Sequence, residues 1–149
     1  MKRIAILSDT HGLLRDEVKE ELKQADIILH AGDINTQAIV DELKSYGTLY
    51  VVRGNNDKEW ANNMPEQLNV TIEGLRFFII DNKKEIPKDL KEVDVIVYGH
   101  SHKYDVNEES GVLMLNPGSC GKRRFGLEIT MCRMIVEDGT YSLEKVNII

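Results

Sequence analysis

The sequence is poor in cysteine, proline and aromatic residues, and it contains no long hydrophobic run. Its two cysteines, Cys120 and Cys132, lack the paired spacing of a disulfide framework, so we expect two reduced thiols in a cytoplasmic protein. No apolar stretch approaches the roughly 20 residues that span a bilayer. The chain opens directly into strand-like sequence, so we also expect no signal peptide.

Positive charge is scarce as well. The chain has 19 lysines and arginines against 25 acidic residues, which gives a net charge of −6 and an isoelectric point of about 5.2. This balance argues against a large nucleic-acid ligand and tolerates a bound cation. With 149 residues, 42% of them hydrophobic and 30% charged, the chain has the size and composition of one globular domain over residues 1–149.

The first third of the chain alternates between strand and helix patterns. The predicted strands cover residues 2–8, 27–30 and 48–52, and the predicted helices cover residues 14–25 and 36–46. Asn35 is the expected N-cap of the second helix, and Gly47 ends it. This βαβαβ order predicts a parallel sheet with right-handed crossovers.

The second half is dominated by strand patterns. We expect one hairpin around Glu73 and Gly74, another around Asp138 and Gly139, and two single strands between them. The predicted strands cover residues 67–72, 75–80, 93–98, 112–115, 127–136 and 140–148. With no repeat or linker, the pattern predicts a two-layered or sandwiched α/β domain whose second half is antiparallel or mixed.

Polar residues follow each of the first three predicted strands. Asp9 and His11 follow the first strand, Asp33 follows the second, and Asn55 and Asn56 follow the third. In open α/β sheets, ligands bind outside the carboxyl ends of the strands. We therefore expect these side chains to lie along one edge, where carboxylate and imidazole groups suit a divalent metal.

Three of the four histidines lie at strand ends. His100 and His102 follow the predicted strand 93–98, and both leave the loop on the same side, so they join His11 as candidate metal ligands. A single Asp or His at such a place is often only a turn or cap residue, but the combination favours a metal site. The fourth, His30, is interpreted as structural or as a group that orients a ligand.

Taken together, these motifs resemble the calcineurin-like metallophosphoesterase superfamily, and its small YfcE-type phosphodiesterase branch in particular. The motifs are Asp9-x-His11, Gly32-Asp33, Gly54-Asn55-Asn56-Asp57, Gly99-His100-Ser101-His102 and Asn116-Pro117-Gly118-Ser119. The resemblance implies a β-sandwich of two mixed sheets flanked by helices, with two divalent metals at the carboxyl ends of strands. It also implies a homodimer or homotetramer.

The resemblance assigns ligands to both metals. The matching positions are Asp9, His11, Asp33 and His102 for one metal, and Asp33, Asn55 and His100 for the other. Asp33 would bridge the two ions, which together would activate a hydroxide against phosphorus and place Asp33 and His100 among the catalytic residues. Mn²⁺ is the expected ion, with Ni, Fe, Zn and Mg as alternatives.

The chain departs from the family pattern at two positions. The family supplies a further histidine to the second metal where this chain has Asp81, which either replaces the imidazole as a ligand or leaves the second site weak. Larger members carry a catalytic histidine where this chain has Asn56. Asn56 either takes a catalytic role by binding the substrate phosphate or only stabilises the turn.

A basic run, Lys122 to Arg124, follows the Asn-Pro-Gly-Ser motif. Arg124 matches a family arginine, so it either binds the substrate phosphate or belongs to a solvated turn. The leading prediction is a metal-dependent phosphodiesterase that acts on a small phosphodiester. The alternatives are a protein-binding scaffold similar to Vps29 with a degraded metal site, and a phosphomonoesterase.

Overall fold

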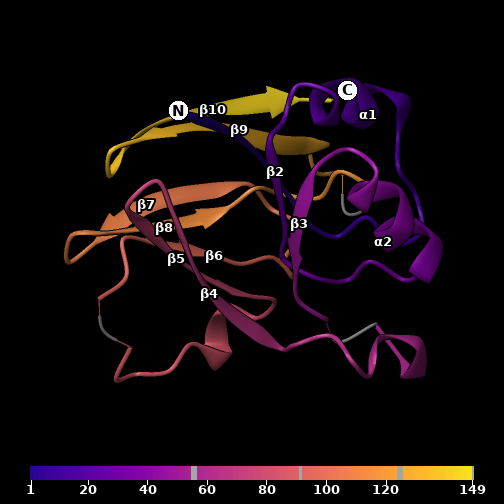
Figure 1. Ribbon diagram of the computed structural model, residues 1–149. Helices are drawn as coiled ribbons and strands as arrows, with labels where there is room; N and C mark the ends of the chain where they lie inside the picture. Colours follow the sequence, from indigo (N-terminus) through magenta and orange to yellow (C-terminus); the bar gives the residue numbers. More distant parts are fainter. Residues whose placement is uncertain (55–56, 91, 124–125, 149) are drawn as a thin grey trace.

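Two mixed β-sheets face each other in the computed structural model, which describes residues 1–54, 57–90, 92–123 and 126–148 (Figure 1). The first sheet has the strand order β10-β9-β1-β2-β3. Its strands are β1 (Lys2–Leu7), β2 (Ile27–His30), β3 (Thr48–Val51), β9 (Thr130–Glu137) and β10 (Thr140–Asn147). β1, β2 and β3 are parallel, and β9 and β10 continue the sheet as an antiparallel hairpin.

The second sheet has the strand order β4-β5-β6-β8-β7. Its strands are β4 (Gln67–Ile72), β5 (Leu75–Ile80), β6 (Val95–Val97), β7 (Asp105–Glu109) and β8 (Val112–Asn116). β5, β6 and β8 run parallel, while β4 and β7 pair antiparallel at the two edges. The predicted sandwich of two mixed sheets flanked by helices is therefore confirmed.

Alternation along the strands builds the core between the sheets. Successive strand residues point to opposite faces, so Ile4 and Ile6 of β1 meet Phe77 and Ile79 of β5 in one buried cluster. These side chains are at most 1% exposed. Each contributes roughly 1.5–3 kcal/mol of burial free energy, which holds the two sheets together.

Two helices cover the outer face of the first sheet (Figure 1). They are α1 (Asp16–Leu22) and α2 (Gln37–Lys44), and they pack Val18, Leu22 and Leu43 onto the sheet. The N-cap of α2 is Thr36, whose hydroxyl accepts a hydrogen bond from the Ile39 N–H, and not Asn35 as the sequence suggested.

The segment after β5 covers the outer face of the second sheet. It contains the 3-10 turn η2 (Lys83–Glu85), and its Ile86 and Leu90 pack on Phe78 and Ile96. A second 3-10 turn, η1 (Glu59–Ala61), carries Trp60 toward the helices. The edge strand β7 was missed by the sequence pattern, because Asp105–Glu109 is polar and lacks the apolar alternation of a half-buried strand. Within the described ranges, no helix is long and apolar enough to cross a membrane.

Candidate metal centre

Loops from both sheets meet at one end of the sandwich. Asp9 and His11 follow β1, Asp33 follows β2, and Asp81 directly follows β5. Backbone hydrogen bonds of 3.0 Å tie the first two loops together, from the Asp9 N–H to the Gly32 carbonyl and from the His11 N–H to the Asp33 carbonyl. Asp81 lies close to Asp33, so the carboxyl ends of strands from the two sheets converge on a single region.

Five of the six described candidate ligands, all but Asp81, share an uncommon backbone conformation. The φ angles of Asp9, His11, Asp33, His100 and His102 are 55°, 47°, 58°, 75° and 65°. This left-handed region is disfavoured for residues with a Cβ, at a cost of the order of 1 kcal/mol each. Strain at five candidate ligands indicates that these loop conformations serve to bring the side chains together in the two clusters.

Asp9, His11 and His102 form the first cluster. The two Nε2 atoms are 3.2 Å apart, and the imidazole rings stack with a centroid distance of 4.9 Å. Oδ1 of Asp9 is 3.7 Å from each Nε2. The Asp9 carboxylate is fully buried, and no hydrogen bond to either of its oxygens is found among the described residues. A buried carboxylate left in this way is costly, and a cation among these three side chains would stabilise it.

Asp33, Asp81 and His100 form the second cluster. His100 Nδ1 lies 3.6 Å from Asp81 Oδ2 and 4.0 Å from Asp33 Oδ2. Both carboxylates are buried, while the His100 side chain is 45% exposed. In each cluster, one ligand atom per residue lies within 4.8 Å of the others. The donor types and their convergence fit a divalent metal in both clusters.

The sequence left open whether Asp81 replaces the family histidine as a ligand of the second metal or leaves that site weak. Its side chain reaches His100 and Asp33, which is where an additional ligand of the second metal would be needed. The adjoining glycines leave room for these carboxylates. A Cβ on Gly54 would lie 2.3 Å from Asp33 Oδ1, and one on Gly32 would lie 2.9 Å from Asp81 Oδ1. These glycines are required by close packing against the acids.

His30 links the loops without joining either cluster. Its Nδ1 accepts a hydrogen bond from the Gly32 N–H at 3.0 Å, and its Nε2 lies 3.1 Å from the Thr10 hydroxyl. Because Thr10 donates to the Ile34 carbonyl, Nε2 is the protonated nitrogen of a neutral ring. Complete burial lowers the pKa of His30 to about 4. The structural interpretation of His30 fits this geometry.

Asp57 is a positioning residue that the sequence reasoning did not single out. Its Oδ1 accepts hydrogen bonds from the Ile34 and Asn35 N–H groups at 2.9 and 2.8 Å, and its Oδ2 accepts one from Gly54 at 2.9 Å. The buried carboxylate thus joins the loop after β2 to the loop after β3. Its place at the end of the Gly-Asn-Asn-Asp motif was the available signal.

The Asn-Pro-Gly-Ser motif positions the histidine loop. The Asn116 amide donates to the Gly99 carbonyl at 3.3 Å and to the Ser101 hydroxyl at 3.1 Å. The Ser119 hydroxyl donates to the Asp9 carbonyl at 3.0 Å. This motif therefore holds the loop that carries His100 and His102 against the loop after β1.

Three predicted site residues, Asn55, Asn56 and Arg124, lie outside the described residues. Of the neighbouring basic run, Arg123 donates to the Leu127 carbonyl at 3.5 Å within its own loop. Cys120 is buried, and burial raises the pKa of its thiol to about 12, so it is not an activated nucleophile. Both cysteines are free.

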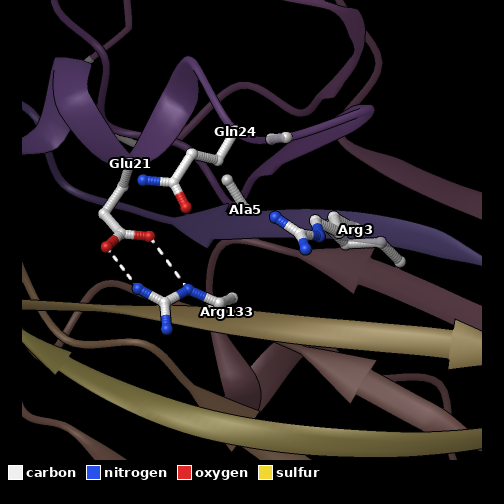
Figure 2. Close-up of a pocket in the computed structure, with 7 residues that line it drawn as sticks. Arg3, Ala5, Glu21, Gln24 and Arg133 are labelled. Atoms are coloured by element: carbon white, nitrogen blue, oxygen red, sulfur yellow. Dashed lines mark hydrogen bonds and ion pairs between the residues drawn. The ribbon is translucent and has the colours of Figure 1, made fainter.

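A separate pocket lies between α1 and the first sheet, away from both clusters. Figure 2 shows Glu21 of α1 paired through two hydrogen bonds with Arg133 of β9, beside Arg3 and Gln24. The cavity measures about 10 Å³, which is room for one water molecule. The Glu21–Arg133 ion pair beside this small cavity fastens α1 to the sheet.

Paired mixed sheets that gather aspartate and histidine at strand ends define a class of metal-binding α/β sandwiches. Within that class, the chain belongs to the calcineurin-like phosphoesterase superfamily, whose domain pattern matches residues 1–139.

Three similar proteins illustrate this relationship. Phosphodiesterase MJ0936 of Methanocaldococcus jannaschii is 28% identical over 140 residues, which cover 79% of this chain and 84% of the relative. Chaetomium thermophilum Vps29 superposes with a TM-score of 0.80 at 23% identity over 98% of this chain and 97% of its own. The E. coli phosphoesterase YfcE superposes with a TM-score of 0.72 at 22% identity, covering 99% of this chain and all (100%) of YfcE. The fold is therefore shared by enzymes and by Vps29.

The pKa of His30 predicts a specific loss of stability in acid. The unfolded residue takes up a proton near pH 6.5, whereas the folded one does so only near pH 4, so stability falls as pH drops between these values. For wild type, His30 should account for a loss of roughly 2 kcal/mol between pH 7 and pH 5. Urea unfolding in EDTA at both pH values measures it. His30→Asn should lack this part of the loss; an equal loss in both proteins would contradict the assignment.

Proposed function

We propose that the protein is a divalent-metal-dependent phosphodiesterase that hydrolyses a small phosphodiester. The observation that carries the proposal is the pair of aspartate–histidine clusters at neighbouring strand ends in a member of this superfamily. The sequence relative named as a phosphodiesterase supports the diester over the monoester. The second cluster supplies two carboxylates and one imidazole, and this excess of carboxylate favours a harder ion such as Mn²⁺.

Each cluster residue has a role in this proposal. Asp9, His11 and His102 would hold one cation. Asp81, His100 and, by its motif position, Asn55 would hold the other. Asp33 would bridge the two cations. The His11 N–H donates a hydrogen bond to the Asp33 carbonyl at 3.0 Å, which keeps Asp33 next to the first cluster and favours this role. Bound cations of this kind acidify water and offset negative charge on phosphoryl oxygens.

The protein's own groups would orient the substrate and exclude water. Asp9 and Asp33 are buried, whereas the His100 side chain is 45% exposed, so a substrate would meet His100 before the two aspartates. Asn56 and Arg124 remain proposed substrate-phosphate ligands by their motif positions. We also propose a reducing, cytoplasmic location, which the two free and buried cysteines favour.

A binding scaffold is the second candidate function. The similarity to Vps29 in fold favours it, and so does the absence of the family histidine at Asp81. A scaffold with a degraded site needs no cation, whereas the phosphodiesterase does. Metal content therefore separates the two candidates.

Activity toward a model diester tests the phosphodiesterase directly. Protein loaded with Mn²⁺ should hydrolyse bis-p-nitrophenyl phosphate faster than p-nitrophenyl phosphate. Asp33→Ala and His100→Ala should each lower kcat/KM by at least about 100-fold, because each removes a metal ligand. Asp41→Ala, which changes an exposed carboxylate on α2, is the matched control and should leave the rate unchanged. Equal rates in wild type and both site variants would refute the proposal.

Removal of Asp81 tests the second metal. Asp81→Ala should reduce Mn²⁺ from about two ions per chain toward one, because the second cluster loses a buried carboxylate while the first is intact. Equilibrium dialysis followed by elemental analysis measures the ratio. Asp89→Ala, in the same segment, serves as the control. A ratio that is the same in wild type and Asp81→Ala would show that Asp81 is not a ligand, and a ratio near zero in wild type would favour the scaffold.

A further inference from the structure

A cavity lined by lysines opens beside His100 on the outer side of the second cluster. Its volume is about 260 Å³, and its lining includes Lys83, Lys84 and Lys103 together with His100 and Asp105. We call it the lysine cavity. Of the residues in the two clusters, only His100 lines it, so the lysine cavity borders the second cluster alone.

The three lysines keep their charge available. None of them forms an ion pair with the part of the chain that the structure describes, although the chain as a whole carries a net charge of −6. Lys83 Nζ lies 5.5 Å from the centre of the Tyr98 ring, a cation–π distance that holds it over the cavity wall. Unpaired lysines gathered in an acidic protein indicate an anionic occupant.

Local structure fixes where these lysines stand. The Asn82 side chain caps the turn that carries Lys83 and Lys84 by accepting a hydrogen bond from the Lys84 N–H at 3.0 Å. The Tyr98 hydroxyl donates to Asp105 at 3.4 Å, and burial raises the pKa of Tyr98 to about 12, so the phenol stays neutral. With Asp105 as the one lining carboxylate among the described residues, positive charge predominates.

A second cavity borders the second cluster at Asp81 and has the opposite charge. Its volume is about 310 Å³, and Glu66, Glu85 and Asp81 line it together with Arg53. We call it the glutamate cavity. Three carboxylates stand against the single guanidinium of Arg53, whose Nη2 donates to the Asp57 carbonyl at 3.1 Å, so negative charge predominates among the described lining residues. The glutamate cavity therefore favours a neutral, hydroxyl-bearing group over an anionic one.

Resting on the phosphodiesterase function proposed above, we propose that these cavities select an asymmetric phosphodiester, one arm of which carries a second phosphate. The lysine cavity would take the phosphorylated arm, and the glutamate cavity would take the uncharged arm. The scissile phosphate would then lie at the second cluster, because His100 lines one cavity and Asp81 lines the other. Lysine binds phosphate as a mobile point charge, which suits an end group more than a fixed reacting centre.

Two matched substrates test this selection. One is thymidine 5′-(p-nitrophenyl phosphate), and the other is the same compound with a phosphate on its 3′-oxygen. Hydrolysis of either one adds water to phosphorus, breaks the bond to the aryl oxygen and releases p-nitrophenolate with a proton. Since only the 3′-phosphate differs, the ratio of the two kcat/KM values reports what that phosphate contributes. We expect a preference of about tenfold for the phosphorylated substrate at low salt.

Variants assign the preference to the lysines. The double variant Lys83→Gln/Lys103→Gln should bring the ratio close to one, and high salt should lower it in wild type because the lysines are exposed. Lys23→Gln is the matched control, on the far end of α1, and should leave the ratio at its wild-type value. A calorimetric comparison of thymidine 3′,5′-bisphosphate with thymidine 5′-monophosphate provides a binding readout that does not depend on turnover.

The outcomes distinguish the two proposals. Hydrolysis of both substrates with a ratio near one, unchanged in the double variant, would overturn the lysine cavity and leave the phosphodiesterase intact. No hydrolysis of either substrate, together with none of bis-p-nitrophenyl phosphate, would overturn the phosphodiesterase itself. Tighter binding of the bisphosphate that the double variant abolishes would still support the lysine cavity in that case.

Discussion

The buried Asp9 carboxylate is the constraint on which the rest of the site depends. It lies at the end of β1 in a left-handed conformation, 3.7 Å from two imidazole nitrogens, and accepts no hydrogen bond from the described residues. A charge removed from water in this way is costly without a partner. Burial of apolar side chains on both faces of β1 offsets this cost in the folded protein, and a bound cation would reduce the cost itself.

The loops around Asp9 are held by residues that belong to neither cluster. His30 fastens the loop after β2 to Thr10, and Asp57 fastens that same loop to Gly54. Asn116 does the same for the loop that carries His100 and His102. The candidate ligands thus come from two sheets, and buried hydrogen bonds hold the three loops that carry Asp9, Asp33 and His100. Such support keeps a polar site organised within a sandwich whose stability comes from apolar packing.

The apolar strands and the positions of the polar loops could be predicted from the sequence, because period-two alternation and strand-end residues are local signals. The edge strand β7 could not, since Val106 is the one apolar residue in Asp105–Glu109 and the strand is defined by its pairing with β8. Asp57 was missed because two of its three partners are backbone N–H groups more than 20 residues away in the sequence. The two cavities of opposite charge also depend on the segment after β5, whose course over the second sheet no local pattern specifies.

The most direct test of the account is the thermal stability of metal-stripped wild type and Asp9→Asn, with and without Mn²⁺. If a bound cation stabilises the buried Asp9 carboxylate, Mn²⁺ should raise the Tm of wild type by several degrees. Without metal, Asp9→Asn should melt higher than wild type, because a neutral amide facing two imidazole nitrogens replaces a buried charge, and Mn²⁺ should add little. A wild-type Tm that does not respond to Mn²⁺, with Asp9→Asn less stable in EDTA, would contradict the account.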